Sequence, residues 1–154
     1  MKIHNLIDSK NVFLDLESGD VRTALSRVAE LFVPTLGIEA GEVVEALIER
    51  ESLGSTSVGD GFAIPHCKIQ GLPQIAIALA RFTAGVPFGG EEQDPVSFIF
   101  VVLSPPDQPA AHLQVLSQIA RVLKRRDLRA DLMSAPNVEE VATALSRTAE
   151  SEGL

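Results

Sequence analysis

The sequence has no tryptophan, no tyrosine and a single cysteine, Cys67, among its 154 residues. With seven phenylalanines as its only large aromatic side chains, it lacks the platform on which single-stranded nucleic acids stack. Basic residues are also few, because 13 Lys and Arg against 21 Asp and Glu give a formal net charge of −8. Nucleic acids and anionic membranes are bound mainly through Lys and Arg, so we expect neither as a partner.

Long apolar segments are absent as well. The longest apolar run, VSFIFVVL at 96–103, has the length of a buried strand and falls well short of the ~18 residues of a membrane span. The first residues, MKIHNLIDSK, lack the apolar centre of a secretory signal. One cysteine cannot form an intramolecular disulfide and fits a reducing compartment. We therefore expect no membrane insertion and a cytoplasmic location.

The spacing of apolar residues predicts strands and helices in one layered α/β domain covering residues 1–154. Predicted strands are 12–16, 74–82 and 96–103, and predicted helices are 18–32, 39–52, 110–125, 127–135 and 137–151. Segment 74–82 alternates isoleucine and leucine with alanine, whereas 96–103 is apolar throughout, as in a strand covered on both faces. Segment 86–95 is predicted to be a turn-rich connection with room for a short strand. The inward residues predicted for helix 110–125 are Leu113, Leu116, Ile119, Ala120 and Leu123.

His66 is the first candidate for chemistry, in the stretch GSTSVGDGFAIPHCKI at 54–69. Pro65 biases Ile64 toward extended backbone, so His66 is expected to leave a strand at a sheet end, where ligands and catalytic groups collect. An imidazole with a pKa near ~6.5 is largely neutral at cytoplasmic pH and able to act as a nucleophile. The alternative is a loop histidine bonded to a backbone carbonyl.

His112 is the second candidate, in the first turn of the predicted helix 110–125. It shares a helical stripe with Leu116 and Ile119, so it is predicted to point toward the body of the protein. The partial positive charge of a helix N-terminus suits an anion such as a phosphoryl group. The alternative is a histidine whose hydrogen bonds are satisfied by solvent.

Metal and thiol chemistry find little support in the sequence. His66 and Cys67 are adjacent in an extended segment and should point in opposite directions, which makes a shared zinc ion unfavourable. The chain has neither C-x-x-C nor H-E-x-x-H, and we expect no metal. The same geometry disfavours a Cys67 nucleophile with a histidine base, and a small buried residue is the other interpretation.

The glycine-rich loop GSTSVGDG lacks the Gly-Lys-Ser/Thr ending of a nucleotide-binding loop. It could form an anion-binding nest with the hydroxyls of Ser55 and Thr56, or it could be a plain turn. Arg50 precedes the loop and is either a surface charge at a helix end or a phosphate partner.

Two segments together carry a family resemblance: RESLGSTSVGDGFAIPHCKI at 50–69 and AAHLQVLSQIARVL at 110–123. The chain resembles the enzyme IIA components of the bacterial phosphoenolpyruvate-dependent phosphotransferase system, of the fructose–mannitol type. Within that family it is most similar to the nitrogen-regulatory branch. The resemblance implies an α/β sandwich in which a mixed sheet is flanked by helices.

The resemblance also implies a function. The histidine of the Ile-Pro-His motif, here His66, accepts a phosphoryl group from the phosphohistidine of an HPr-type carrier, with His112 supporting it and Arg50 associated with the site. No cofactor is implied, because the donor is itself a phosphoprotein. Two alternatives stay open: a sugar-specific component that passes phosphate to a IIB domain, and an interaction module in which His66 is never modified. Regulatory target proteins are the remaining expected partners.

Overall fold

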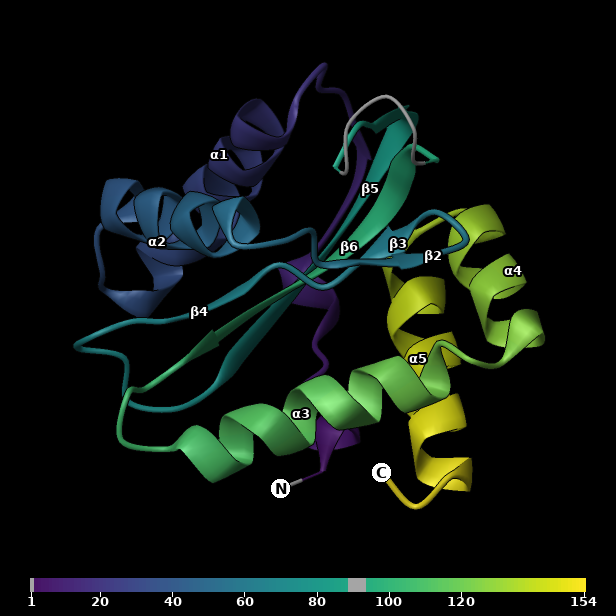
Figure 1. The fold of residues 1–154 in the computed structure, drawn as a ribbon. Helices are drawn as coiled ribbons and strands as arrows, with labels where there is room; N and C mark the ends of the chain where they lie inside the picture. The colour runs from purple at the N-terminus through teal and green to yellow at the C-terminus, as the bar shows by residue number, and fades with distance from the viewer. Residues whose placement is uncertain (1, 89–93) are drawn as a thin grey trace.

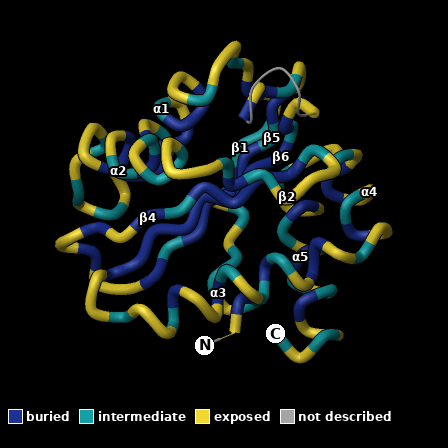
Figure 2. The backbone as a smooth tube through the Cα atoms, in the orientation of Figure 1, coloured by how far each residue is buried: buried dark blue, intermediate teal, exposed yellow. Residues whose placement is uncertain are grey.

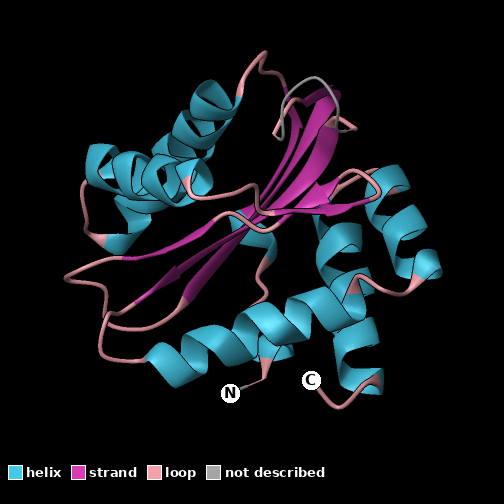
Figure 3. Cartoon of the chain, in the orientation of Figure 1, coloured by secondary structure: helices cyan, strands magenta, loops and turns pink. Residues whose placement is uncertain are grey.

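The computed structural model describes residues 2–88 and 94–154, and a twisted β-sheet runs between two groups of helices (Figure 1; Figure 3). The strands are β1 Val12–Leu16, β2 Ser57–Gly59, β3 Phe62–Ala63, β4 His66–Lys68, β5 Ala76–Val86 and β6 Val96–Ser104. The α-helices are α1 Val21–Phe32, α2 Ala40–Ser52, α3 Pro109–Val122, α4 Arg126–Ser134 and α5 Val138–Ser151. Three short 3-10 helices, η1 Ile3–Asn5, η2 Ser9–Asn11 and η3 Val33–Leu36, complete the described elements.

The sheet is mixed. Its order is β1-β5-β6-β3-β2, and β4 also pairs with β6. Strands β5 and β6 are antiparallel, whereas β3 and β4 both run parallel to β6. The mixed sheet flanked by helices that the resemblance implied is confirmed. No helix within residues 2–88 and 94–154 is long and apolar enough to cross a membrane.

Each face of the sheet has its own core, and both cores are continuous with the buried strands (Figure 2). Helices α1 and α2 cover one face, and α3, α4 and α5 cover the other (Figure 1). Strand β5 sends Ile77 and Leu79 to the α3 side and Ala78 and Ala80 to the α1 side. This alternation, and the burial of β6 on both faces, confirm the strand patterns predicted from the sequence.

The segment before His66 differs from the predicted loop. Residues 57–63 form a β-hairpin, whose two-residue turn places Asp60 and Gly61 at positive φ (57° and 86°), as Asp-Gly turns require. Beyond the hairpin the chain continues along β6, pairing Ala63 with Ile99 and then His66 with Val102 without a change of register. His66 therefore begins the edge strand β4, and the prediction that it leaves a strand is wrong. Pro65 explains the interruption, because it has no N–H to donate to the ladder.

The predicted inward face of α3 is confirmed at Ile119 and Leu123, which are buried, and Leu116 and Ala120 pack partly buried against the same core. The buried residues within the helix are His112, Val115, Ile119 and Val122, so the inward assignment of Leu113 is wrong: this side chain is 65% exposed. Strand β5 extends four residues beyond the predicted end, to Val86, and residues 89–93 of the predicted 86–95 connection lie outside the described residues.

The orientation of α3 predicts two unequal substitutions on one helix. Ile119 is 1% exposed in the core, so Ile119→Ala should lower the free energy of unfolding by about 2–5 kcal/mol. Leu113→Ala on the exposed face should change it by less than about 0.5 kcal/mol. Urea unfolding followed by circular dichroism measures both, and equal losses would contradict the observed orientation of the helix.

Candidate functional site

His66 lies on the α3 side of the edge strand β4, at the point where β4 and α3 approach each other. Its pairing partner on β6, Val102, belongs to the core under α3. Its ring lies 5.5 Å from the ring of His112, centroid to centroid. The two histidines singled out from the sequence are therefore brought together, although 46 positions separate them in the numbering (112 − 66).

The backbone fixes the tautomer of His66. Nδ1 lies 2.7 Å from the carbonyl oxygen of Ile64, and a carbonyl only accepts hydrogen bonds. Nδ1 must therefore carry the proton and donate it, which leaves the lone pair on Nε2. A bond to a backbone carbonyl is what the interpretation of His66 as a structural loop histidine predicts. The same bond also prepares Nε2 as a nucleophile, so by itself it does not distinguish a structural histidine from a nucleophilic one.

Arg50 reaches His66 from the last turn of α2. Its Nε donates to Nε2 of His66 at 3.3 Å, and its Nη1 donates to the carbonyl oxygen of Gly54 at 2.8 Å. Burial lowers the pKa of His66 below its ordinary value, and the charge of Arg50 acts in the same direction. The hydrogen bond to Ile64 and the charge of Glu51 oppose this shift. The net effect favours a neutral, nucleophilic imidazole near pH 7.

His112 is 6% exposed and points inward from the first turn of α3, as predicted. Nδ1 of His112 is hydrogen-bonded to a protein group and not to solvent, because it lies 2.5 Å from Oγ of the buried Ser104. Burial lowers the pKa of His112 to about 4, and the nearby His66 and Lys68 act in the same direction. His112 is thus neutral at neutral pH.

The loop before the hairpin is held by a residue that sequence reasoning missed. Glu51 accepts hydrogen bonds from both the backbone N–H and the hydroxyl of Thr56. Both Thr56 donors are thereby engaged, which gives Thr56 a structural part in the loop instead of an open position for an anion. Ser55 Oγ accepts from the backbone N–H of Ser57 at 3.1 Å, and its hydroxyl proton can still be donated. The contact between Glu51 and Thr56 could not be predicted, because no known sequence motif pairs an acidic residue at a helix end with a threonine five positions later.

Cys67 points away from His66, as the alternation of an extended chain predicted. It is buried in the core between the sheet and helices α1 and α2. Burial raises the pKa of its thiol to about 12, so the thiolate is essentially unpopulated at neutral pH. A nucleophilic thiol needs a low pKa, and Cys67 does not have one.

A hollow of about 410 Å³ opens over His66 and His112, with walls from α2, β4 and α3. A second hollow of about 440 Å³ shares Arg50 and His66 with the first and reaches the hairpin strand β2. Among the described residues, the large apolar side chains classed as exposed are Leu53, Val58 and Leu113, and all three line these hollows. The histidine pair therefore lies in an open depression with an apolar margin.

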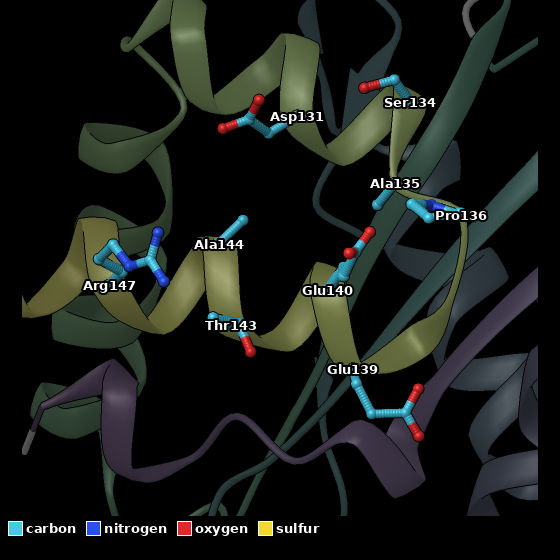
Figure 4. A pocket seen from close by; sticks show the side chains of 9 residues that line it. All are labelled: Asp131, Ser134, Ala135, Pro136, Glu139, Glu140, Thr143, Ala144 and Arg147. Carbon is cyan, nitrogen blue, oxygen red and sulfur yellow. The ribbon is translucent and has the colours of Figure 1, made fainter.

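A different hollow, of about 390 Å³, lies between α4 and α5 (Figure 4). Figure 4 shows Asp131 on α4 facing α5, which carries Glu139, Glu140 and Arg147. With three carboxylates against one guanidinium, this hollow is unfavourable for an anionic phosphoryl group. It contains no histidine, and the depression around His66 is the better candidate site.

Comparison with known proteins agrees with this geometry. The sequence pattern of the family described as "Phosphoenolpyruvate-dependent sugar phosphotransferase system, EIIA 2" matches residues 5–148. The chain belongs to this family of phosphotransferase-system components.

Both branches of the family occur among its relatives. The nitrogen regulatory protein of Pseudomonas aeruginosa is 34% identical, over 90% of this chain and 91% of that protein. The crystal structure of the nitrogen regulatory protein IIA-Ntr from Neisseria meningitidis superposes with a TM-score of 0.86 at 33% identity, covering 93% and 98% of the two chains. A fructose-specific EIIA component from Haloferax volcanii is 32% identical, over 89% and 93%. The resemblance to the nitrogen-regulatory branch is confirmed.

The low pKa of His112 predicts a specific response to acid. Folding favours its neutral form, because the pKa is about 4 in the folded protein and ~6.5 in an unfolded chain. Its contribution to the free energy of unfolding is therefore complete above about pH 6.5 and is lost as the pH falls toward about 4. Between pH 7 and pH 5, urea unfolding should show a loss about 1–2 kcal/mol larger in the wild type than in His112→Gln.

Nuclear magnetic resonance provides an independent check on the same group. The ring-carbon protons of His112 should titrate with a midpoint well below pH 6. A midpoint at the ordinary histidine value, or equal pH slopes for wild type and His112→Gln, would contradict the burial of a neutral imidazole.

Proposed function

We propose that this chain is a phosphocarrier whose His66 accepts a phosphoryl group on Nε2 from the phosphohistidine of an HPr-type carrier, in a nitrogen-regulatory role. The observation that carries the proposal is the set of groups around Nε2 of His66: the Ile64 carbonyl leaves the lone pair on this nitrogen, the cationic Arg50 donates to it, and the His112 ring lies 5.5 Å from the His66 ring. Membership of the EIIA type-2 family supports it. We further propose that residues 1–154 act as one such domain and that the protein works in the cytoplasm, with the carrier.

The transfer requires little covalent chemistry from the protein. The lone pair on Nε2 of His66 forms a bond to phosphorus while the P–N bond of the donor breaks, and that electron pair returns to the donor nitrogen. Positive charge develops on the His66 ring as the new bond forms. The Ile64 carbonyl at Nδ1 stabilises this charge, because a hydrogen bond from a cationic donor is stronger than one from a neutral donor.

The remaining work is to position the phosphoryl group and to neutralise its charge. Arg50 already donates to Nε2 of His66, the atom that becomes phosphorylated. When phosphorus occupies that position, the guanidinium N–H that faced the lone pair faces the phosphoryl oxygens instead. His112, whose ring lies 5.5 Å from that of His66, contributes a second donor, with Ser55 as a further candidate. Thr56 supports the loop through Glu51 instead of binding phosphate directly.

The surroundings of His66 fit a protein partner better than a small substrate. The depression is open, and Leu53, Val58 and Leu113 form an exposed apolar margin around it. Protein interfaces bury apolar centres of this kind inside a polar rim. A phosphorylated carrier protein is therefore the donor that the surface favours.

A second candidate function is a sugar-specific IIA component that passes the phosphoryl group to a IIB domain. The observation that favours it is the 32% identical fructose-specific relative. Incubation of the phosphorylated chain with IIB domains of the fructose and mannitol type separates the two roles, since only the sugar-specific component should transfer rapidly to one of them.

The central proposal predicts a phosphoramidate on one histidine. Incubation with phosphoenolpyruvate, the upstream kinase of the system and the HPr-type carrier should add one phosphoryl group per chain, measured by intact mass. The group should be lost in mild acid and survive alkali, and His66→Ala should acquire none. His4→Ala, which alters a histidine outside the site, and Cys67→Ala should both be phosphorylated. A label that survives acid, or that persists in His66→Ala, would overturn the proposal.

The hydrogen bond from Arg50 to His66 predicts a graded loss of the phosphoryl-transfer rate when Arg50 is replaced. Hydrogen bonds to charged groups are worth about 1.5–3 kcal/mol, so Arg50→Ala should slow single-turnover transfer about tenfold to a hundredfold. Arg50→Lys keeps the charge but loses the planar fork and should fall between Ala and wild type. Arg22→Ala, which breaks an exposed ion pair with Glu45, is the matched control and should transfer normally. Wild-type rates in a folded Arg50→Ala would remove Arg50 from the site.

A further inference from the structure

In the part of the chain that the structure describes, Ser104 is the one residue whose side chain makes a direct hydrogen bond to His112. It ends strand β6, is completely buried, and pairs with Lys68 of β4 in the sheet. Between Ser104 and His112 the chain leaves the sheet, turns and enters α3, so that α3 brings His112 back over the end of β6. The resulting contact joins Oγ of Ser104 to Nδ1 of His112 at 2.5 Å.

The hydrogen bond could run in either direction, and burial decides which. If Nδ1 carried the proton and donated it, the Ser104 hydroxyl would need another acceptor for its own hydrogen. Within residues 2–88 and 94–154, Nδ1 of His112 is the only hydrogen-bond partner of that hydroxyl. A buried hydroxyl with an unmade donor bond costs about 1–3 kcal/mol, so the hydroxyl donates and Nδ1 accepts.

This direction places the remaining proton on Nε2 of His112. Among the described residues Nε2 has no partner, and no unpartnered side-chain nitrogen or oxygen is fully buried, so Nε2 reaches solvent. His112 lines the same hollow as His66, with the ring centroids 5.5 Å apart. An N–H bond is therefore directed to the open side of the site, where a phosphoryl group on His66 would lie.

We propose that Ser104 is a positioning residue, which fixes His112 as the Nε2–H tautomer so that His112 donates to a phosphoryl oxygen on His66. The proposal rests on the proposed phosphorylation of His66. The two rings are then held in opposite tautomers: the Ile64 carbonyl takes the Nδ1 proton of His66, and the Ser104 hydroxyl occupies the Nδ1 lone pair of His112. One ring offers a lone pair at Nε2 and the other offers a proton at Nε2.

A spectroscopic measurement tests the tautomers without any phosphoryl transfer. Long-range ¹H–¹⁵N correlation spectra of the unphosphorylated protein, with ¹⁵N-labelled histidine, distinguish protonated from unprotonated ring nitrogens. We expect a protonated Nε2 in His112 and a protonated Nδ1 in His66. A protonated Nδ1 in His112 would overturn the proposal.

A pair of variants of equal shape separates the hydroxyl from its packing. Ser104→Thr keeps the hydroxyl and Ser104→Val replaces it with a methyl group in the same volume, so any strain from the larger side chain is shared. Single-turnover transfer from the phosphorylated carrier should be about threefold to tenfold slower in Ser104→Val than in Ser104→Thr. In Ser104→Val the His112 spectrum should change from one tautomer to a mixture.

Ser104→Ala adds a variant without overpacking, and it should show the same mixture and a similar loss. Ser97→Ala, the same change at the opposite end of β6, is the control and should leave both the His112 spectrum and the transfer rate unchanged. Equal rates in Ser104→Thr, Ser104→Val and Ser104→Ala would overturn the positioning role. Failure of the proposed function appears separately, as a label that persists in His66→Ala.

Discussion

The site depends on one strand pairing, the parallel alignment of residues 62–68 with β6. It pairs His66 with Val102 and Lys68 with Ser104, and so fixes which side chains face α3 and which face α1 and α2. His66 goes to the first side and Cys67 to the second. A shift of one residue would exchange them, burying the imidazole in the core and presenting the thiol to the site. The buried, apolar β6 holds this register by packing on both faces.

Desolvation lowers the pKa of both histidines, but the neutral form has a different consequence in each. Burial lowers the pKa of each, and both rings are neutral near pH 7. For His66 the neutral form supplies a lone pair. For His112 it removes a positive charge that would otherwise lie 5.5 Å from the His66 ring, which becomes positive in the proposed transfer. Arg50 then remains as the permanent cation bonded to His66, and in the proposed arrangement His112 contributes a directed N–H bond.

Much of the fold follows from short-range patterns. The isoleucine–alanine alternation of β5 and the continuous apolar run of β6 are visible in the sequence because each strand buries both faces. The histidine pair was found because both lie in motifs with local signals, a proline-bounded extended segment and a helix start. Leu113 was misplaced because apolar residues flank the buried stripe of α3 on both sides, and the sheet contact selects the stripe of Ile119. Ser104 and Glu51 were missed because their partners lie across a turn or a helix end, where side-chain spacing carries no signal.

The burial of Cys67 beside His66 has a consequence for oxidising conditions. A thiolate attacks peroxides and disulfides as the nucleophile, and a buried thiol with a pKa of about 12 offers almost no thiolate at neutral pH. Cys67, which is next to the proposed phosphoryl acceptor, should therefore resist oxidation at neutral pH, even though it is the only sulfhydryl in the chain.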